Sequence, residues 1–160
     1  MLRKLMFDRI KAFLDGRDAP DEGVNNDDAL ADAAAAVLVE AALLDGNVDD
    51  AERQIIVDIL HDRFELAAED ADALITGIVE DPHHANRVYA ATKTIRDSFS
   101  EEQRIEIMEM LWRVAYADGT LHDYEANLVR RTAGLLYVPD QESGRARKRA
   151  LKRLGLEDSV

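Results

Sequence analysis

Apolar residues recur every three or four positions along most of this chain, which is the spacing of one face of an α-helix. Clusters of strand-forming residues are few. We therefore predict an all-α fold, a compact single-domain bundle of about seven to eight helices. In the body of the chain the expected helices cover residues 28–45, 50–63, 68–80, 83–98, the stretch between Ser100 and Asp118, 122–136, and a last helix from Pro139.

The first 27 residues differ in pattern from the rest. Residues 1–14 have the spacing of an amphipathic helix with a basic face, and residues 15–27 are rich in Asp, Gly, Pro and Asn, which predicts an acidic flexible linker. Residues 28–156 then form the helical domain, because 160 residues suffice for one core and leave little room for a second. Pro82 suits the first turn of the fourth helix of this domain.

One eight-residue turn occurs twice. Residues 45–52 read DGNVDDAE and residues 118–125, 73 positions later, read DGTLHDYE; each joins two amphipathic helices. At that offset Leu38 matches Leu111 and Phe64 matches Tyr137, so the similarity extends into the flanking helices. The chain is therefore an internal duplication.

Much of the repeated turn is explained by helix geometry. Gly46 and Gly119 supply the left-handed backbone conformation that ends a helix at little cost. Asp49 followed by Glu52 predicts an N-cap with an acid at the third helical position.

The first acid of each turn needs a further explanation. Asp45 and Asp118 come at the end of a helix, where a carboxylate faces the negative end of the helix dipole. We expect a partner that offsets this cost: backbone N–H groups of the following turn, a nearby arginine, or a cation shared with Glu52 and Glu125. Of these, we favour the backbone N–H groups.

Charge is distributed unevenly. The net charge is −13, and residues 15–81 alone carry twenty acidic and three basic residues. Such a surface repels nucleic acid and attracts cations or basic protein surfaces. We therefore expect a protein partner and no nucleic acid. No apolar run is long enough to cross a bilayer and no secretory signal pattern is present, so we expect a cytoplasmic protein.

A metal site in this chain must use oxygen or imidazole ligands, since there is no cysteine. The EF-hand pattern fits only in part. Asp45, Asn47 and Asp49 occupy its first, third and fifth positions, but Asp50 stands where the pattern needs glycine and Ile56 where it needs glutamate. An acidic site of another kind, assembled from both turns, stays open.

The paired pattern of an apolar helix, Asp-Gly, an aliphatic residue, two acids and a second apolar helix resembles the TerB-like family, named for tellurite resistance. The resemblance covers residues 30–138 and is closest at WRVAYADG, residues 112–119. It implies a compact fold of about seven helices with pseudo-twofold symmetry. Related domains are found beside DnaJ-like co-chaperones and in stress-response operons.

The resemblance also implies a site. The family's acidic surface residues are suspected of binding metal or a partner. By position, these residues are Asp45, Asp49, Glu52, Asp118, Asp123 and Glu125. His122 replaces an acid of the first copy, which departs from the pattern.

These observations favour a non-enzymatic stress-response or interaction module that binds a divalent cation at the paired acidic turns. A second hypothesis is a metal-dependent phosphohydrolase-like enzyme, which would need His61, Asp62, His122 and Asp123 to converge. A third is an adaptor that contacts a membrane surface peripherally through residues 1–14. Oligomeric state has no signature in the sequence.

Overall fold

The computed structural model describes residues 26–43 and 46–157, and within these ranges it contains helices and no strand, which confirms the all-α prediction. The helices are α2 (Asn26–Ala42), α3 (Asp50–Phe64), α4 (Ala68–Val79), α5 (His84–Ser98), α6 (Glu101–Ala115), α7 (Asp123–Leu135) and α8 (Asp140–Arg153). The predicted N-terminal helix and residues 15–25 of the predicted linker lie outside the described residues.

Helix boundaries follow the sequence prediction closely, with two differences. Helix α2 begins at Asn26, so the last two residues of the predicted linker are helical. Pro82 lies in the turn ahead of α5, which begins only at His84, and not in the first turn of that helix as predicted. Ser100 caps α6, because its Oγ accepts a hydrogen bond from the Gln103 N–H at 3.1 Å.

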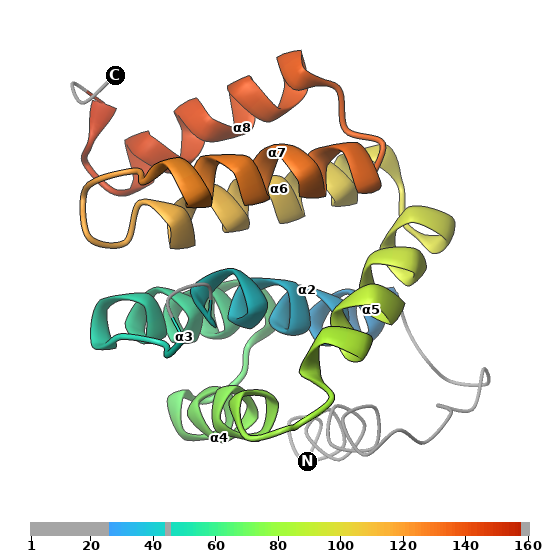
Figure 1. The fold of residues 1–160 in the computed structure, drawn as a ribbon, viewed down its shortest axis with the longest axis vertical. Coiled ribbons are helices and arrows are strands. Elements are labelled where there is room, and N and C mark those ends of the chain that lie inside the picture. Colours follow the sequence, from blue (N-terminus) through green and yellow to red (C-terminus); the bar gives the residue numbers. More distant parts are fainter. Residues whose placement is uncertain (1–25, 44–45, 158–160) are drawn as a thin grey trace.

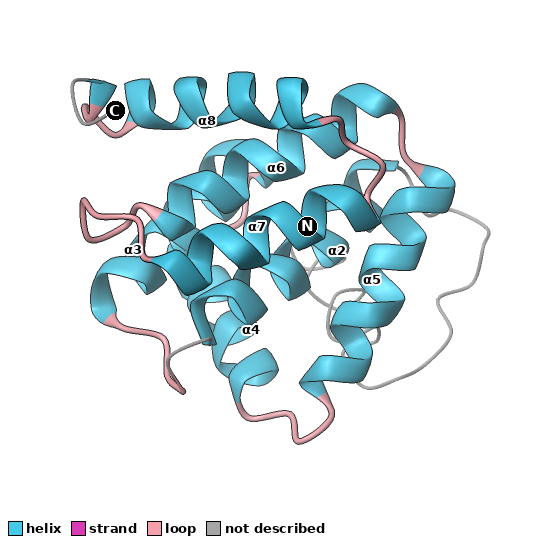
Figure 2. Ribbon diagram, turned by 45° about the horizontal axis from the view of Figure 1, so that its top comes forward, coloured by secondary structure: helices cyan, strands magenta, loops and turns pink. Residues whose placement is uncertain are grey.

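Two helix hairpins form the body of the fold (Figure 1). Helices α2 and α3 make the first, α6 and α7 make the second, and α4 and α5 connect them. Helix α2 packs against α3, α4, α5 and α6, while α6 packs against α2, α3, α7 and α8. The hairpins therefore meet through their first helices, and α8 covers α6 on the side away from α4 (Figure 1). Short loops join the helices from α3 to α8 (Figure 2).

The core is built from small side chains on α2 and large ones on α6. Four successive alanines, Ala33 to Ala36, are at most 2% exposed, which lets four neighbouring helices approach α2 closely. At the duplicated position of Ala35, α6 carries Met108, which is also fully buried. The two hairpins thus share a backbone plan and differ in how they fill the space.

The two copies differ by one residue at their ends. Phe64 is buried, whereas Tyr137, its predicted match, is 66% exposed and has a φ of +57°. Leu136 is fully buried, and Glu65 has a φ of +61°. Leu136 is therefore the counterpart of Phe64 and Tyr137 that of Glu65. The predicted pairing of Phe64 with Tyr137 was wrong, because the second copy is one residue shorter before its left-handed turn.

Candidate functional site: the paired hairpin turns

The start of α3 is held by a reciprocal pair of hydrogen bonds. Asp49 Oδ1 accepts from the Glu52 N–H at 2.7 Å, and Glu52 Oε1 accepts from the Asp49 N–H at 3.1 Å. Two backbone donors that the first helical turn would otherwise leave unpaired are thereby satisfied. The predicted cap is confirmed.

The start of α7 has a similar arrangement with a different first residue. Glu125 Oε1 accepts from the His122 N–H at 3.2 Å. The His122 ring stacks on Tyr124 with 5.5 Å between ring centroids. The second copy therefore keeps the glutamate that reaches back to the cap and replaces the capping acid with an aromatic base.

Both glycines adopt the conformation that the sequence predicts. Gly46 has a φ of +96° and Gly119 a φ of +87°. Each glycine N–H donates to a carbonyl three residues earlier, on Leu43 and Tyr116 respectively, at 2.9 Å. A left-handed residue at this point turns the chain out of the first helix, as expected for a helix C-terminus.

Asp118 has the backbone partner that we favoured. Its Oδ1 accepts from the Thr120 N–H at 2.9 Å, and its Oδ2 lies 3.2 Å from His122 Nε2. The backbone hydrogen bond, followed by the His122 side chain, lowers the pKa of this carboxyl. Asp118 therefore fixes the geometry of its own turn. Asp45, its counterpart, lies outside the described residues.

Glu52 is the unusual carboxyl of the site. It is only 7% exposed, although it is one of the most strongly hydrated side-chain types. Burial raises its pKa to about 7, the Asp49 N–H opposes that rise, and the negative charges of Asp49 and Glu125 add to it. Glu125 belongs to the other copy, so the charge of the duplicated glutamate contributes to the raised pKa of Glu52.

The predicted metal ligands belong to the two hairpin turns. Among residues 26–43 and 46–157, no three His, Asp or Glu side chains are placed to hold a metal ion. The predicted ligands in this part of the chain are Asp49, Glu52, Asp118, Asp123 and Glu125. Asp45 lies outside it, so the metal site stays a prediction.

The residues of the hydrolase hypothesis are not brought together either. His61, Asp62, His122 and Asp123 all lie in the described part of the chain, which holds no such three-ligand group. His61 Nδ1 lies instead 2.9 Å from the Leu66 carbonyl oxygen, and His122 contacts Asp118. Both imidazoles therefore have local contacts in their own turns.

Comparison with known families agrees with this architecture. The family model described as tellurite resistance protein TerB matches residues 31–148. The chain belongs to the TerB family. The match begins in α2 and ends in α8, so it includes both duplicated turns of this TerB-family protein. Neither the curated proteins nor the solved structures contain a match. None of the helices in the described ranges has the length and apolar character that a membrane span requires.

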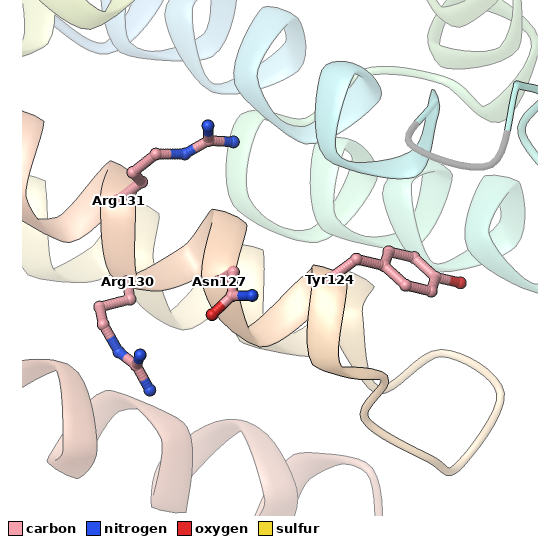
Figure 3. A pocket seen from close by; sticks show the side chains of 4 residues that line it. All are labelled: Tyr124, Asn127, Arg130 and Arg131. Atoms are coloured by element: carbon pink, nitrogen blue, oxygen red, sulfur yellow. The ribbon is translucent and has the colours of Figure 1, made fainter.

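One surface of α7 was missed by the sequence analysis. Tyr124, Asn127, Arg130 and Arg131 line an open groove of about 510 Å³ on this helix (Figure 3). Helical periodicity predicts only that these side chains face away from the core. A comparison of the two copies position by position would have singled them out, because the first copy has no arginine at the matching places.

Proposed function

We propose that this TerB-family protein is a non-enzymatic interaction and stress-response module whose paired hairpin turns hold a hydrated divalent cation. The observation that carries the proposal is the buried carboxyl of Glu52, which burial gives a pKa of about 7, with the negative charge of Glu125 from the other copy adding to the rise. A buried carboxyl near a second carboxyl is stabilised in its charged form by any nearby positive charge.

The chemistry of the donors favours a weakly held, hydrated ion. Two approaching carboxylates are too few for calcium, which takes six to eight oxygen ligands. Magnesium keeps several waters and is commonly held by one or two carboxylates. Glu52 and Glu125 would supply these oxygens, Asp45 is a further predicted ligand, and Asp118 would act only by fixing its turn.

Calorimetric titration tests the proposal. Chelator-stripped protein is titrated with calcium, magnesium, zinc and manganese at pH 7.5, beside the variants Glu52→Gln, Asp45→Asn and Asp118→Asn. We expect saturable binding of magnesium or manganese, weakened at least about tenfold by Glu52→Gln, and a smaller loss in Asp118→Asn, because residues that orient a ligand matter less than the ligand itself.

Glu80→Gln is the matched control, because this exposed acid at the end of α4 lies in neither turn. It should leave binding unchanged. Absence of heat with every ion, or an equal loss in Glu80→Gln and Glu52→Gln, would refute the cation site and leave the turns as structural elements only. Thermal unfolding of each variant separates lost binding from lost folding.

A further inference from the structure

Arg130 and Arg131 are adjacent exposed arginines of this acidic protein. Of the other ten arginines in the described residues, seven have a carboxylate oxygen within 3.3 Å, and the remaining three, Arg104, Arg113 and Arg147, are only partly exposed. Arg130 and Arg131 are exposed, and no acid of the described chain pairs with either. The protein has 33 acidic residues and 20 basic ones, so two adjacent arginines without a carboxylate partner are unexpected on electrostatic grounds.

The duplicated fold does not require these charges. At the same offset the first copy has Val57 in place of Arg130 and Asp58 in place of Arg131. Val57 is 9% exposed. Both helices nevertheless adopt the same hairpin, so the arginines are a property of the second copy alone.

The surroundings of the two arginines have the composition of a protein interface. Tyr124 at the start of α7 is 43% exposed, and Leu135 and Tyr137 at its end are 51% and 66% exposed. Tyrosine and arginine are the residues most enriched at interface hot spots. We call the exposed residues Tyr124, Asn127, Arg130, Arg131, Leu135 and Tyr137 the α7 strip.

The directions of the side chains exclude a single small anion. Figure 3 shows the guanidinium groups of Arg130 and Arg131 pointing away from each other on either side of α7, with Asn127 between them and Tyr124 directed toward the α6–α7 turn. Two guanidinium groups that converge would hold one phosphate or carboxylate. Groups that diverge need a ligand with several separate anionic groups.

We propose that the α7 strip binds an acidic peptide segment of a partner protein, with carboxylates on Arg130 and Arg131 and an apolar side chain against Tyr124. Charge complementarity selects this occupant. A second copy would bring two molecules of net charge −13 together, whereas a short acidic segment meets the half of the chain from residue 82 onward, in which thirteen basic and twelve acidic residues nearly balance. This surface is separate from the proposed cation site.

Fluorescence anisotropy tests the proposal with defined probes. The first probe is a labelled twelve-residue peptide in which pairs of Glu and Leu alternate, and the second is the same peptide with Gln for every Glu. In 50 mM salt we expect saturable binding of the Glu peptide to the full chain, and at least tenfold weaker binding of the Gln peptide. The Arg130→Glu/Arg131→Glu variant should also bind the Glu peptide at least tenfold more weakly.

The control variant is Lys93→Gln/Lys152→Gln, which removes two exposed positive charges from α5 and α8. It should change peptide affinity by less than threefold. Equal losses in both double variants, or no binding of the Glu peptide, would overturn the proposal. Circular dichroism and thermal unfolding verify that the exposed substitutions leave the fold intact, and an unchanged magnesium titration separates this surface from the paired turns.

Three competing occupants are tested in the same experiments. Inorganic phosphate that displaces the peptide at millimolar concentration with one-to-one stoichiometry would replace the proposal with a small-anion site. Tighter binding of a labelled single-stranded oligonucleotide than of the peptide would replace it with a nucleic-acid surface. Concentration-dependent dimerisation in sedimentation equilibrium that Arg130→Glu/Arg131→Glu abolishes would make the α7 strip a contact between copies.

Discussion

The two helix hairpins have the same turn geometry but differ in their core side chains and in their surface charge. Both have a left-handed glycine in the turn after the first helix and begin the second helix with a glutamate that reaches back to the cap. The first hairpin, however, has an alanine-rich central helix and a buried acid at its turn. The second has larger core side chains and a basic strip. Turn geometry is therefore the common requirement of the two hairpins, while core packing and surface charge can differ.

The largest expected effect concerns how each copy fills the core. Met108 on α6 and Ala35 on α2 occupy matching positions, and both are fully buried. Met108→Ala would leave a cavity beside helices that cannot collapse onto it, lowering the free energy of unfolding by about 2–5 kcal/mol. Urea denaturation at fixed pH measures the loss. A change below about 1 kcal/mol would mean that α6 tolerates small residues as α2 does.

The reciprocal variant sharpens this result. Ala35→Met inserts the larger residue into the helix that four others surround, and overpacking of this kind costs about 1–3 kcal/mol. If Ala35→Met is neutral, the space around α2 is not set by its alanines, and the contrast between the two copies fails.

The second effect concerns the buried acid. Glu52 has a folded pKa of about 7 against an ordinary value of 4.5. Below pH 4.5 its carboxyl is protonated in both the folded and the unfolded state, so it does not change the free energy of unfolding. As pH rises from 4.5 to 7 the folded chain binds more protons than the unfolded chain, so stability falls, and above 7 the cost is complete. The Glu52→Gln variant has no ionisable group at this position. Relative to the natural protein, its free energy of unfolding should therefore rise by about 2 kcal/mol between pH 5 and pH 8.

Chelator-stripped protein is required for this measurement, since a bound cation would reverse the effect. Glu125→Gln is the control from the second copy: it removes only the smallest of the contributions that raise the Glu52 pKa. The pH-dependent gain in the free energy of unfolding should therefore be smaller for Glu125→Gln than for Glu52→Gln. Equal gains, or a Glu52→Gln effect independent of pH, would show that the two glutamates do not differ as their burial suggests.

Much of this architecture could be predicted from the sequence, because its signals are local. Helical periodicity placed the helices, and the Asp-Gly turns placed their boundaries to within a few residues. The raised pKa of Glu52 could not be predicted, since the burial that causes it is a property of the folded chain and not of the local sequence. The match of Phe64 with Tyr137 failed for a related reason: a one-residue deletion at a helix end leaves the apolar pattern almost unchanged.

Site prediction succeeded where the partner is a neighbour in sequence. Asp118 binds the N–H of Thr120, two residues along, and that contact follows from turn chemistry alone. Arg130 and Arg131 gave no such signal, because a solvated arginine and a recognition arginine look alike in a helical pattern. Only the structure shows that no carboxylate of the described chain forms an ion pair with either arginine.

The smallest expected effect tests what the copies share. A Cβ added at Gly46 or Gly119 would meet nothing within 4 Å, so alanine there introduces backbone strain without a clash. Because both φ values are strongly positive, each substitution should lower the free energy of unfolding by about 1–2 kcal/mol, and by similar amounts in the two copies. Gly134→Ala inside α7, also unobstructed, should instead stabilise by about 0.5–1 kcal/mol. Unequal losses at Gly46 and Gly119 would show that one turn relaxes where the other cannot, and the shared geometry would no longer be the common requirement.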